Sequence, residues 1–202
     1  LQISKNTSIL IDCGLFQGED AGVDLAIDFD ISNVTALIVT HCHIDHVGRI
    51  PYLLAAGFTG PIYTSVASAS LLPLVIEDAL KVGVTRDQTI INACLNLLSK
   101  LIIKVEFNTW FELPVNNNHE LAKARLQRAG HILGSAYVEI DIGKKPSSHR
   151  VVFSGDLGAP YTPLLPSPKA PYKADTLVIE STYGDKNHQG RKHRTQTLKN
   201  II

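Results

Sequence analysis

Residues 40–48 read THCHIDHVG and place three histidines and one aspartate directly after the apolar run ALIVT. The run is typical of a buried strand, which would deliver the histidines to the loop at its end. On an extended chain His41 and His43 point to one side and can bind one cation, while Asp45 and His46 can reach a second. Imidazole and carboxylate ligands together suit zinc. A solvated turn with accidental histidines does not account for this HxHxDH spacing.

The composition indicates one globular domain. The chain has 202 residues, of which 45% are hydrophobic and 19% charged, and its formal net charge is zero. Proteins that bind nucleic acid over a wide face are usually basic, so this balance gives no support to such a partner unless its phosphates meet metal ions. No apolar run has membrane-spanning length, so we expect no membrane partner. Three cysteines without paired spacing favour reduced thiols and a cytoplasmic location.

Short apolar runs alternate with segments of helical spacing, which predicts an α/β fold. Helices are expected at 50–58, 67–82 and 86–100, with Gly83 as a natural break between the last two. Strands are expected at 8–12, 36–40, 61–65 and 101–107 and over the segments YVEIDIG, RVVFSGD and TLVIEST.

Four other segments complete the pattern. Residues 120–130, ELAKARLQRAG, have helical propensity but also fit a short strand. Residues 158–174 hold five prolines and must form an irregular surface connection. Residues 191–194 are a basic run near His188, for which a solvated helix start is favoured over a phosphate contact. Residues 194–202 predict the beginning of a helix.

Further ligand candidates lie where other strands end. His131 sits in RAGHILGSA and Asp156 in VVFSGDLG, and both are loop positions beside strands. Each alone would be an ordinary loop residue, but the cluster at 41–46 needs ligands from separate segments. Asp12 ends the strand SILID. It would hydrogen-bond a metal-bound water or orient a ligand, and the alternative is a simple loop acid before Gly14.

Several motifs accompany the cluster along most of the chain. HCHIDH is followed by Gly48, with IDCG upstream and GHILGSA and FSGDLG downstream. Together they resemble the metallo-β-lactamase fold. IESTYGDKNH at 179–188, taken with GHILGSA, resembles the β-CASP branch of RNA-processing nucleases. That branch includes the endonuclease subunit of the cleavage and polyadenylation specificity factor and its bacterial and archaeal exonuclease relatives. The resemblance covers about residues 8–200.

The resemblance implies an αββα sandwich with two zinc ions in the cleft between its sheets. Matching positions assign one zinc to His41, His43 and His131, the other to Asp45 and His46, and both to Asp156 as a bridge. Asp12 matches an acid that helps to position the bridging water, and Glu180 matches one that supports a catalytic histidine. The catalytic residues implied in this way are Asp12, Asp45, Asp156 and Glu180.

The implied activity is that of a zinc-dependent RNA nuclease, acting as an exonuclease, an endonuclease or both. A hydroxide activated by two metal ions would hydrolyse the phosphodiester bond and leave a 5′-phosphate and a 3′-hydroxyl. The substrate would be single-stranded RNA. Homodimerisation of the intact protein is compatible with this assignment. The alternatives are a small-molecule metallo-hydrolase of the same fold and a non-cutting subunit of an RNA-processing complex. A DNA-processing β-CASP enzyme ranks lower, because GHILGSA resembles the RNA-processing members more closely.

The resemblance also predicts what part of a domain this chain represents. Residues 1–202 would be the N-terminal part of a metallo-β-lactamase domain, ending near the point where a β-CASP insertion would begin. The β-CASP domain and the C-terminal return of the sandwich would lie outside it, together with one more ligand for the second zinc. We therefore expect an incomplete sandwich that is inactive on its own.

Overall fold

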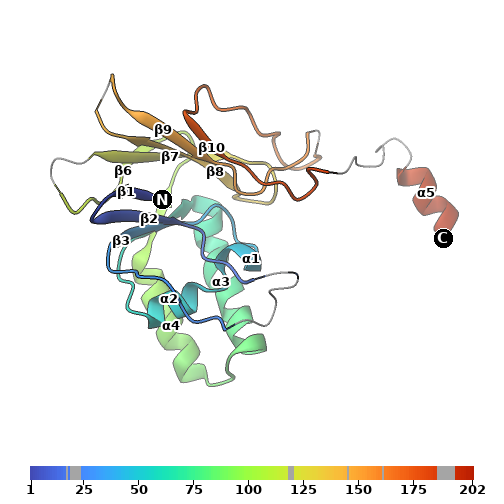
Figure 1. Ribbon diagram of the computed structural model, residues 1–202. Coiled ribbons are helices and arrows are strands. Elements are labelled where there is room, and N and C mark those ends of the chain that lie inside the picture. Colours follow the sequence, from blue (N-terminus) through green and yellow to red (C-terminus); the bar gives the residue numbers. More distant parts are fainter. Residues whose placement is uncertain (17, 19–23, 118–120, 145, 161, 186–193) are drawn as a thin grey trace.

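Two β-sheets stacked face to face form the framework of the molecule (Figure 1). The first sheet has the strand order β1-β2-β3-β4-β5, and the second has the order β10-β9-β8-β7-β6. This arrangement is seen in a computed structural model that describes residues 1–16, 18, 24–117, 121–144, 146–160, 162–185 and 194–202.

The first sheet contains the apolar runs of the N-terminal half. Its strands are β1 (Gln2–Ser4), β2 (Thr7–Ile11), β3 (Val34–Ile38), β4 (Ile62–Ser65) and β5 (Ile102–Val105). β1 pairs antiparallel with β2, and the other neighbours are parallel. The central strands β3 and β4 are buried along most of their length, as parallel strands covered on both faces are, which explains the apolar run ALIV at 36–39.

Helices α1 to α4 lie on one face of the first sheet, and the second sheet lies on the other (Figure 1). Their bounds are α1 (Ile44–Val47), α2 (Ile50–Ala55), α3 (Val66–Gly83) and α4 (Gln88–Leu101). The predicted helices are confirmed, including the end of α3 at Gly83, and Leu72 and Leu98 bury their side chains completely against this sheet. Within the described residues, every helix is too short or too polar to cross a membrane.

The second sheet is antiparallel from β6 to β9 and gains β10 in parallel. Its strands are β6 (Trp110–Glu112), β7 (Ala122–Arg128), β8 (Ala136–Ile142), β9 (His149–Phe153) and β10 (Thr176–Val178). A fifth helix, α5 (Arg194–Ile201), forms where the sequence predicts a helix to begin.

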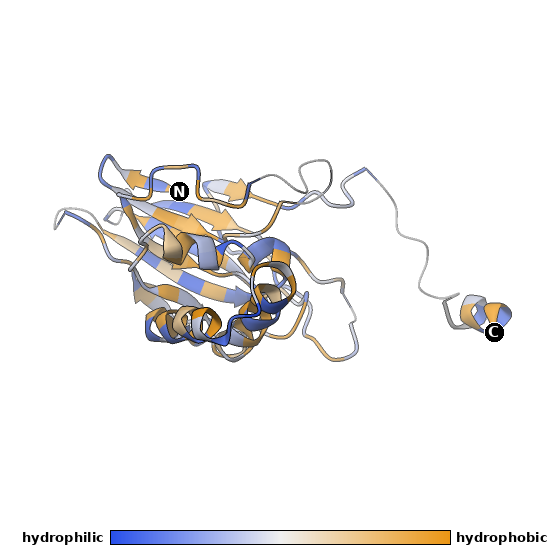
Figure 2. Ribbon diagram, turned by 90° about the horizontal axis from the view of Figure 1, so that it is seen from below, coloured by the Kyte–Doolittle hydropathy of each residue, from blue (hydrophilic) through white to orange (hydrophobic). Residues whose placement is uncertain are grey.

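The ambiguous segment at 120–130 contains strand β7 and not a helix. Ala122, Ala124 and Leu126 are buried in the core between the sheets, while the residues between them face outward. Figure 2 shows this alternation of apolar and polar residues along the strands. A period of two is what a strand requires, and pairing with both β6 and β8 outweighs the helical propensity of the segment.

The outer face of the second sheet holds charged side chains at low exposure. Glu139 on β8 is 1% exposed and forms an ion pair with Arg125 on β7. Asp141 on β8 accepts two hydrogen bonds from Arg150 on β9, at 2.6 and 2.8 Å. The guanidinium groups of both arginines lie over the ring of Trp110, at 4.6 and 5.2 Å. Buried carboxylates of this kind depend on their partners to offset desolvation.

Candidate metal centre

The loops that leave strands β3, β7 and β9 bring four ligand side chains to one rim of the sandwich. His41 and His43 follow β3, His131 follows β7, and Asp156 follows β9. One ligand atom from each of these four residues lies within 4.8 Å of all the others. The structure therefore gathers residues that are far apart in sequence, in the combination that the sequence predicts for one ion.

The nitrogens of the first group converge on a single point. The Nδ1 atom of His43 lies 3.0 Å from Nε2 of His41 and 3.0 Å from Nε2 of His131. The Oδ2 atom of Asp156 lies 3.5 Å from Nε2 of His131 and 3.8 Å from Nε2 of His41. Three imidazole nitrogens and a carboxylate oxygen facing one another form a donor set that suits zinc.

A second group shares Asp156 with the first. Helix α1 carries Asp45 and His46, and these two residues join Asp156 in a cluster of three donors. The Nε2 atom of His46 lies 3.2 Å from Oδ1 of Asp156 and 3.7 Å from Oδ2 of Asp45. The two oxygens of Asp156 thus face different groups, which is the placement that a bridging carboxylate requires.

Asp12 determines which nitrogen of two histidines is free. Its Oδ2 accepts hydrogen bonds from Nδ1 of His46 and from Oγ1 of Thr40, both at 2.7 Å. Because a carboxylate can only accept, His46 carries its proton on Nδ1 and has a free lone pair on Nε2. The Thr40 hydroxyl has donated its hydrogen, so it accepts from Nδ1 of His41 at 3.1 Å, and Nε2 of His41 is also free.

The backbone at Asp12 adopts a conformation that places this carboxylate behind the ligands. Its φ of 58° is uncommon for a residue with a side chain, and aspartate tolerates it better than most. Its Oδ1 accepts from the Thr40 backbone N–H at 2.7 Å, so both carboxylate oxygens contact protein donors. Oδ1 of Asp12 thus holds the Thr40 backbone, while Oδ2 holds the side chains of Thr40 and His46.

Gly14 allows the chain after Asp12 to pass directly against helix α1. A Cβ atom at this position would lie 1.5 Å from the backbone oxygen of Asp45. The close approach is fixed by a hydrogen bond of 2.8 Å from the Cys13 N–H to the backbone oxygen of His46. The segment that carries Asp45 and His46 is therefore held by backbone contacts, which only glycine permits at position 14.

Burial and neighbouring charges keep two of the histidines neutral. Burial, followed by the charges of His46, His43 and His131, lowers the pKa of His41 to about 2. Burial is also the main reason that the pKa of His131 is lowered. Neutral imidazoles are the form that binds metal ions. His41 is fully buried, whereas the side chains of His131 and Asp156 are 28% and 25% exposed. The first group is therefore shielded from solvent at His41 and accessible at His131 and Asp156.

His46 lies in a more acidic setting. Burial lowers its pKa, but the hydrogen bond to Asp12 and the charges of Asp12, Asp156 and Asp45 outweigh burial, and the pKa is raised. Three carboxylates thus favour a positive charge at this position, whether it comes from a proton or from a metal ion. The donor sets of both groups therefore fit metal ions in their chemistry as well as in their distances.

Other side chains hold the loops that carry His131 and Asp156. Oγ of Ser135 accepts from the backbone N–H of His131 at 2.9 Å, which fixes the turn GHILGSA. Glu180 accepts from the Leu157 N–H at 2.6 Å and from the Thr182 hydroxyl at 2.9 Å. These contacts place Glu180 beside the Asp156 loop. Its predicted support of a catalytic histidine has no counterpart among the contacts of Glu180 in the described part of the chain.

Several site features were not found by sequence reasoning. Thr40 was treated as the end of a strand, although its hydroxyl links Asp12 to His41. Ser135 directly follows the second glycine of GHILGSA, a motif that indicates a tight turn but does not predict the contact of this hydroxyl with the His131 backbone. Cys42 points away from the centre, as its alternation predicts, and its Sγ donates to the Ser68 backbone oxygen at 3.3 Å. His188 and residues 191–193 lie outside the described residues.

Replacing Asp12 with alanine is expected to weaken metal binding by about 10- to 100-fold, because His46 and Thr40 lose the acceptor that orients them. Titration with zinc against a competing chelator measures the change. Asp78→Ala is the matched control, since Asp78 is an exposed acid on α3. Equal zinc affinity in the Asp12 and Asp78 variants would contradict the orienting role.

Comparison with known proteins agrees with this geometry. Residues 1–181 match the family model of the metallo-beta-lactamase superfamily. Ribonuclease TTHA0252 of Thermus thermophilus is 34% identical over 208 residues, covering 100% of this chain and 44% of that protein. Endoribonuclease ysh-1 of Neurospora crassa is 31% identical, covering 98% of this chain and 23% of its own length. Transcription termination factor FttA of Methanocaldococcus jannaschii is 31% identical, and the match covers 90% of this chain and 28% of that protein.

The chain spans less than half the length of each of these relatives. The family match, in contrast, extends from the first strand through Asp156 and Glu180 and includes every predicted ligand. The two-sheet architecture and the His/Asp clusters at its rim agree with this family match. The chain belongs to the metallo-β-lactamase superfamily.

Proposed function

We propose that this chain carries the metal centre of a β-CASP ribonuclease that hydrolyses single-stranded RNA. The observation that carries the proposal is the pair of donor groups that share Asp156 at an accessible rim. The names of the relatives support RNA as the substrate, since two of them are a ribonuclease and an endoribonuclease. The proposed products are a 5′-phosphate and a 3′-hydroxyl.

Two zinc ions are the proposed cofactors. One would be held by His41, His43, His131 and Asp156, and the other by Asp45, His46 and Asp156. Bound there, zinc would acidify a water molecule and neutralise negative charge on the phosphodiester group. Such a centre attracts an anionic substrate without a basic protein surface, which agrees with the zero net charge of the chain.

The protein's own residues prepare the site before substrate arrives. Asp12 holds His46 and, through Thr40, His41 in the tautomers that direct Nε2 into the centre. Glu180 holds the backbone beside Asp156, and Ser135 holds the turn that carries His131. Pre-oriented ligands do not have to reorganise during the reaction, which is the main contribution that a protein makes to such a centre.

The proposed domain organisation follows from the same resemblance. Residues 1–202 would be the N-terminal part of the catalytic domain in a longer, cytoplasmic protein with a β-CASP insertion. The remaining ligand of the second zinc and the partner histidine of Glu180 would come from outside this segment.

Metal removal is expected to abolish RNA cleavage by the full-length protein. The assay uses 5′-labelled single-stranded RNA and DNA of the same sequence, before and after treatment with a chelator, and again after zinc is restored. We expect loss of at least about a thousandfold in rate and recovery with zinc, because without the ions no water is acidified and no charge on the phosphodiester is neutralised. The ladder of products separates exonuclease from endonuclease action.

Two results would overturn the proposal. Cleavage that persists at full rate without metal would exclude a metal-dependent nuclease. A protein that binds zinc but leaves RNA intact would favour either a small-molecule hydrolase or a non-cutting subunit. Hydrolysis of thioester or lactam substrates would then separate these two alternatives.

A further inference from the structure

A polar hollow lies on the outer face of the second sheet. Its volume is about 490 Å³, which falls within the usual range for small-ligand sites. Its floor is formed by strands β7 and β8, and its rim by the proline-rich segment that the sequence predicts to be an irregular connection. The lining residues that matter here are Arg125, Arg128, Tyr137, Glu139, Lys169 and Tyr172.

The hollow is positively charged although the whole chain is neutral. Among its described lining residues three side chains are cationic and one, Glu139, is acidic; Glu139 is buried and already paired with Arg125. Arg128 and Lys169 are exposed, and within the described part of the chain neither forms an ion pair. Two positive charges therefore remain for a ligand, and the chemistry they favour is a phosphate.

Aromatic side chains accompany these charges. Tyr172 stands on the rim and is 98% exposed, whereas Tyr137 lies in the floor and is 5% exposed. Arg128 pairs with Ala136 and so shares the inward face of β7 with Leu126, and its guanidinium lies at the end of the strand, 4.9 Å from the ring centre of Phe107. An exposed aromatic ring beside free cationic groups is the combination by which proteins bind single-stranded nucleic acid, with bases on rings and phosphates on cations.

The hollow adjoins the metal centre. Arg128 is the last residue of β7, and the turn that follows carries His131. The rim segment packs on this turn, because a Cβ atom on Gly130 would lie 2.5 Å from the backbone oxygen of Pro166. The hollow and the metal centre therefore lie near the same end of β7.

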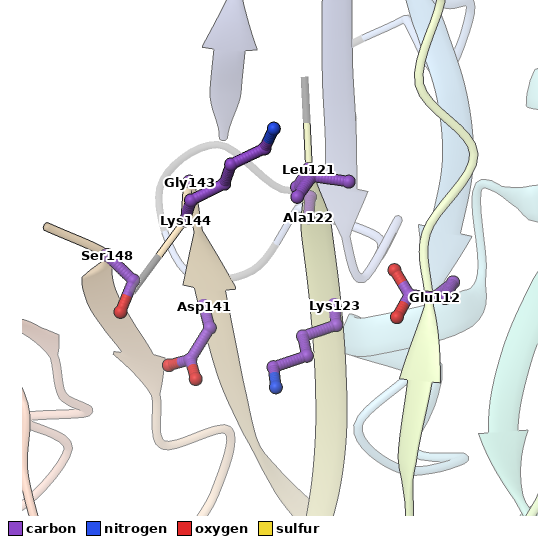
Figure 3. Close-up of a pocket in the computed structure, with 8 residues that line it drawn as sticks. All are labelled: Glu112, Leu121, Ala122, Lys123, Asp141, Gly143, Lys144 and Ser148. Atoms are coloured by element: carbon purple, nitrogen blue, oxygen red, sulfur yellow. The ribbon is translucent and has the colours of Figure 1, made fainter. Parts of the chain in front are cut away.

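A smaller hollow at the opposite end of the same sheet provides a contrast (Figure 3). Its volume is about 240 Å³, and Glu112, Lys123 and Asp141 line it from the adjacent strands β6, β7 and β8. With Lys144, the described residues of its lining include two acids and two lysines, whose formal charges balance. Charge, and not the mere presence of a depression, distinguishes the hollow beside the metal centre.

We propose that the hollow lined by Arg128, Lys169 and Tyr172 binds a nucleotide of single-stranded RNA outside the metal centre. Lys169 contacts one phosphate in the hollow, Arg128 contacts the next phosphate at the end of β7, and the ring of Tyr172 stacks on a neighbouring base. This inference rests on the proposed nuclease function and adds to it a path for the substrate. It assigns RNA binding to residues that hold no metal ion.

The test compares two double variants of the full-length protein. Arg128→Gln with Lys169→Gln removes the free charges of the hollow. Arg86→Gln with Lys104→Gln removes the same types of charge at exposed positions after α3 and on β5. Binding of a labelled oligouridylate is measured by fluorescence anisotropy over a range of salt, with metal chelated so that no cleavage occurs.

The hollow variant is expected to bind about tenfold more weakly and to lower the slope of log affinity against log salt by about 1.4, as loss of two phosphate contacts predicts. The control variant should keep the wild-type slope. Tyr172→Ala should weaken binding about fivefold at all salt concentrations, and Tyr172→Phe should restore it, because stacking needs only the ring.

The outcomes separate the two proposals. If the hollow variant binds RNA as the wild type does and still cleaves it in a metal-dependent way, the RNA-binding role of the hollow is overturned and the nuclease function stands. A wild-type protein that neither binds nor cuts RNA would overturn both. Competition by polyglutamate as strong as competition by oligouridylate would show unspecific attraction of anions and would also overturn the assignment to RNA.

Discussion

Replacing Asp156 with alanine is expected to lower RNA cleavage by the full-length protein at least about a thousandfold. The reason is the position of its carboxylate, whose Oδ1 faces His46 and whose Oδ2 faces His131 and His41. No other residue belongs to both donor groups formed by the described residues. Its loss therefore removes one donor from each group at once.

Two measurements are needed to interpret this result. Initial rates with zinc in excess report activity, and elemental analysis after gel filtration reports bound zinc. Zinc content should fall with activity, whereas Asp78→Ala, which removes an exposed acid from α3, should change neither. Asp156 is 25% exposed, so its truncation leaves no large cavity. Full activity in the Asp156 variant would remove the basis of the proposed centre.

Arg125→Ala is expected to lower the free energy of unfolding by about 3–5 kcal/mol, the usual cost of breaking a buried ion pair from one side. Glu139, 1% exposed, would be left in the sheet without the guanidinium that offsets its desolvation. Urea unfolding of the chain, followed by the fluorescence of Trp110, measures the change. The ring of Trp110 lies 4.6 Å from the Arg125 guanidinium carbon, so it reports on this part of the sheet directly.

A second variant distinguishes this cause from a loss of packing. Arg125→Met combined with Glu139→Leu replaces the ion pair with apolar side chains of similar size. It should be within about 2 kcal/mol of the wild type, or more stable, because neither charge then has to be desolvated. If the double variant is as unstable as Arg125→Ala, shape and not charge determines the stability of this face.

The parts of the fold that could be predicted from sequence are those where one local pattern dominates. Leucine spacing gave α3 and α4, and Gly83 gave the break between them. The residue types and spacing of the HxHxDH cluster alone predict a metal centre. The loop positions of His131 and Asp156 beside strands made them further candidates, and the resemblance to the metallo-β-lactamase fold assigned both to the centre.

Tertiary contacts decided the rest. Residues 120–130 contain good helix formers, and only pairing with β6 and β8 makes them a strand. The linking role of Thr40 depends on a hydrogen bond to Asp12, a residue from a different strand end. The charged outer face arises because alternate residues of three strands meet there, which no single segment reveals. Strand β6 was not predicted either, because its three residues are too few to show an alternation of apolar and polar side chains.

Gly14 shows that the sequence signature of such a protein need not consist only of reactive groups. It offers no donor, acceptor or charge, yet a methyl group there would collide with the Asp45 carbonyl at 1.5 Å. In a screen of random variants, position 14 would therefore be as intolerant as a ligand position. Steric fit between two backbones, and not chemistry, would account for its place in the IDCG motif.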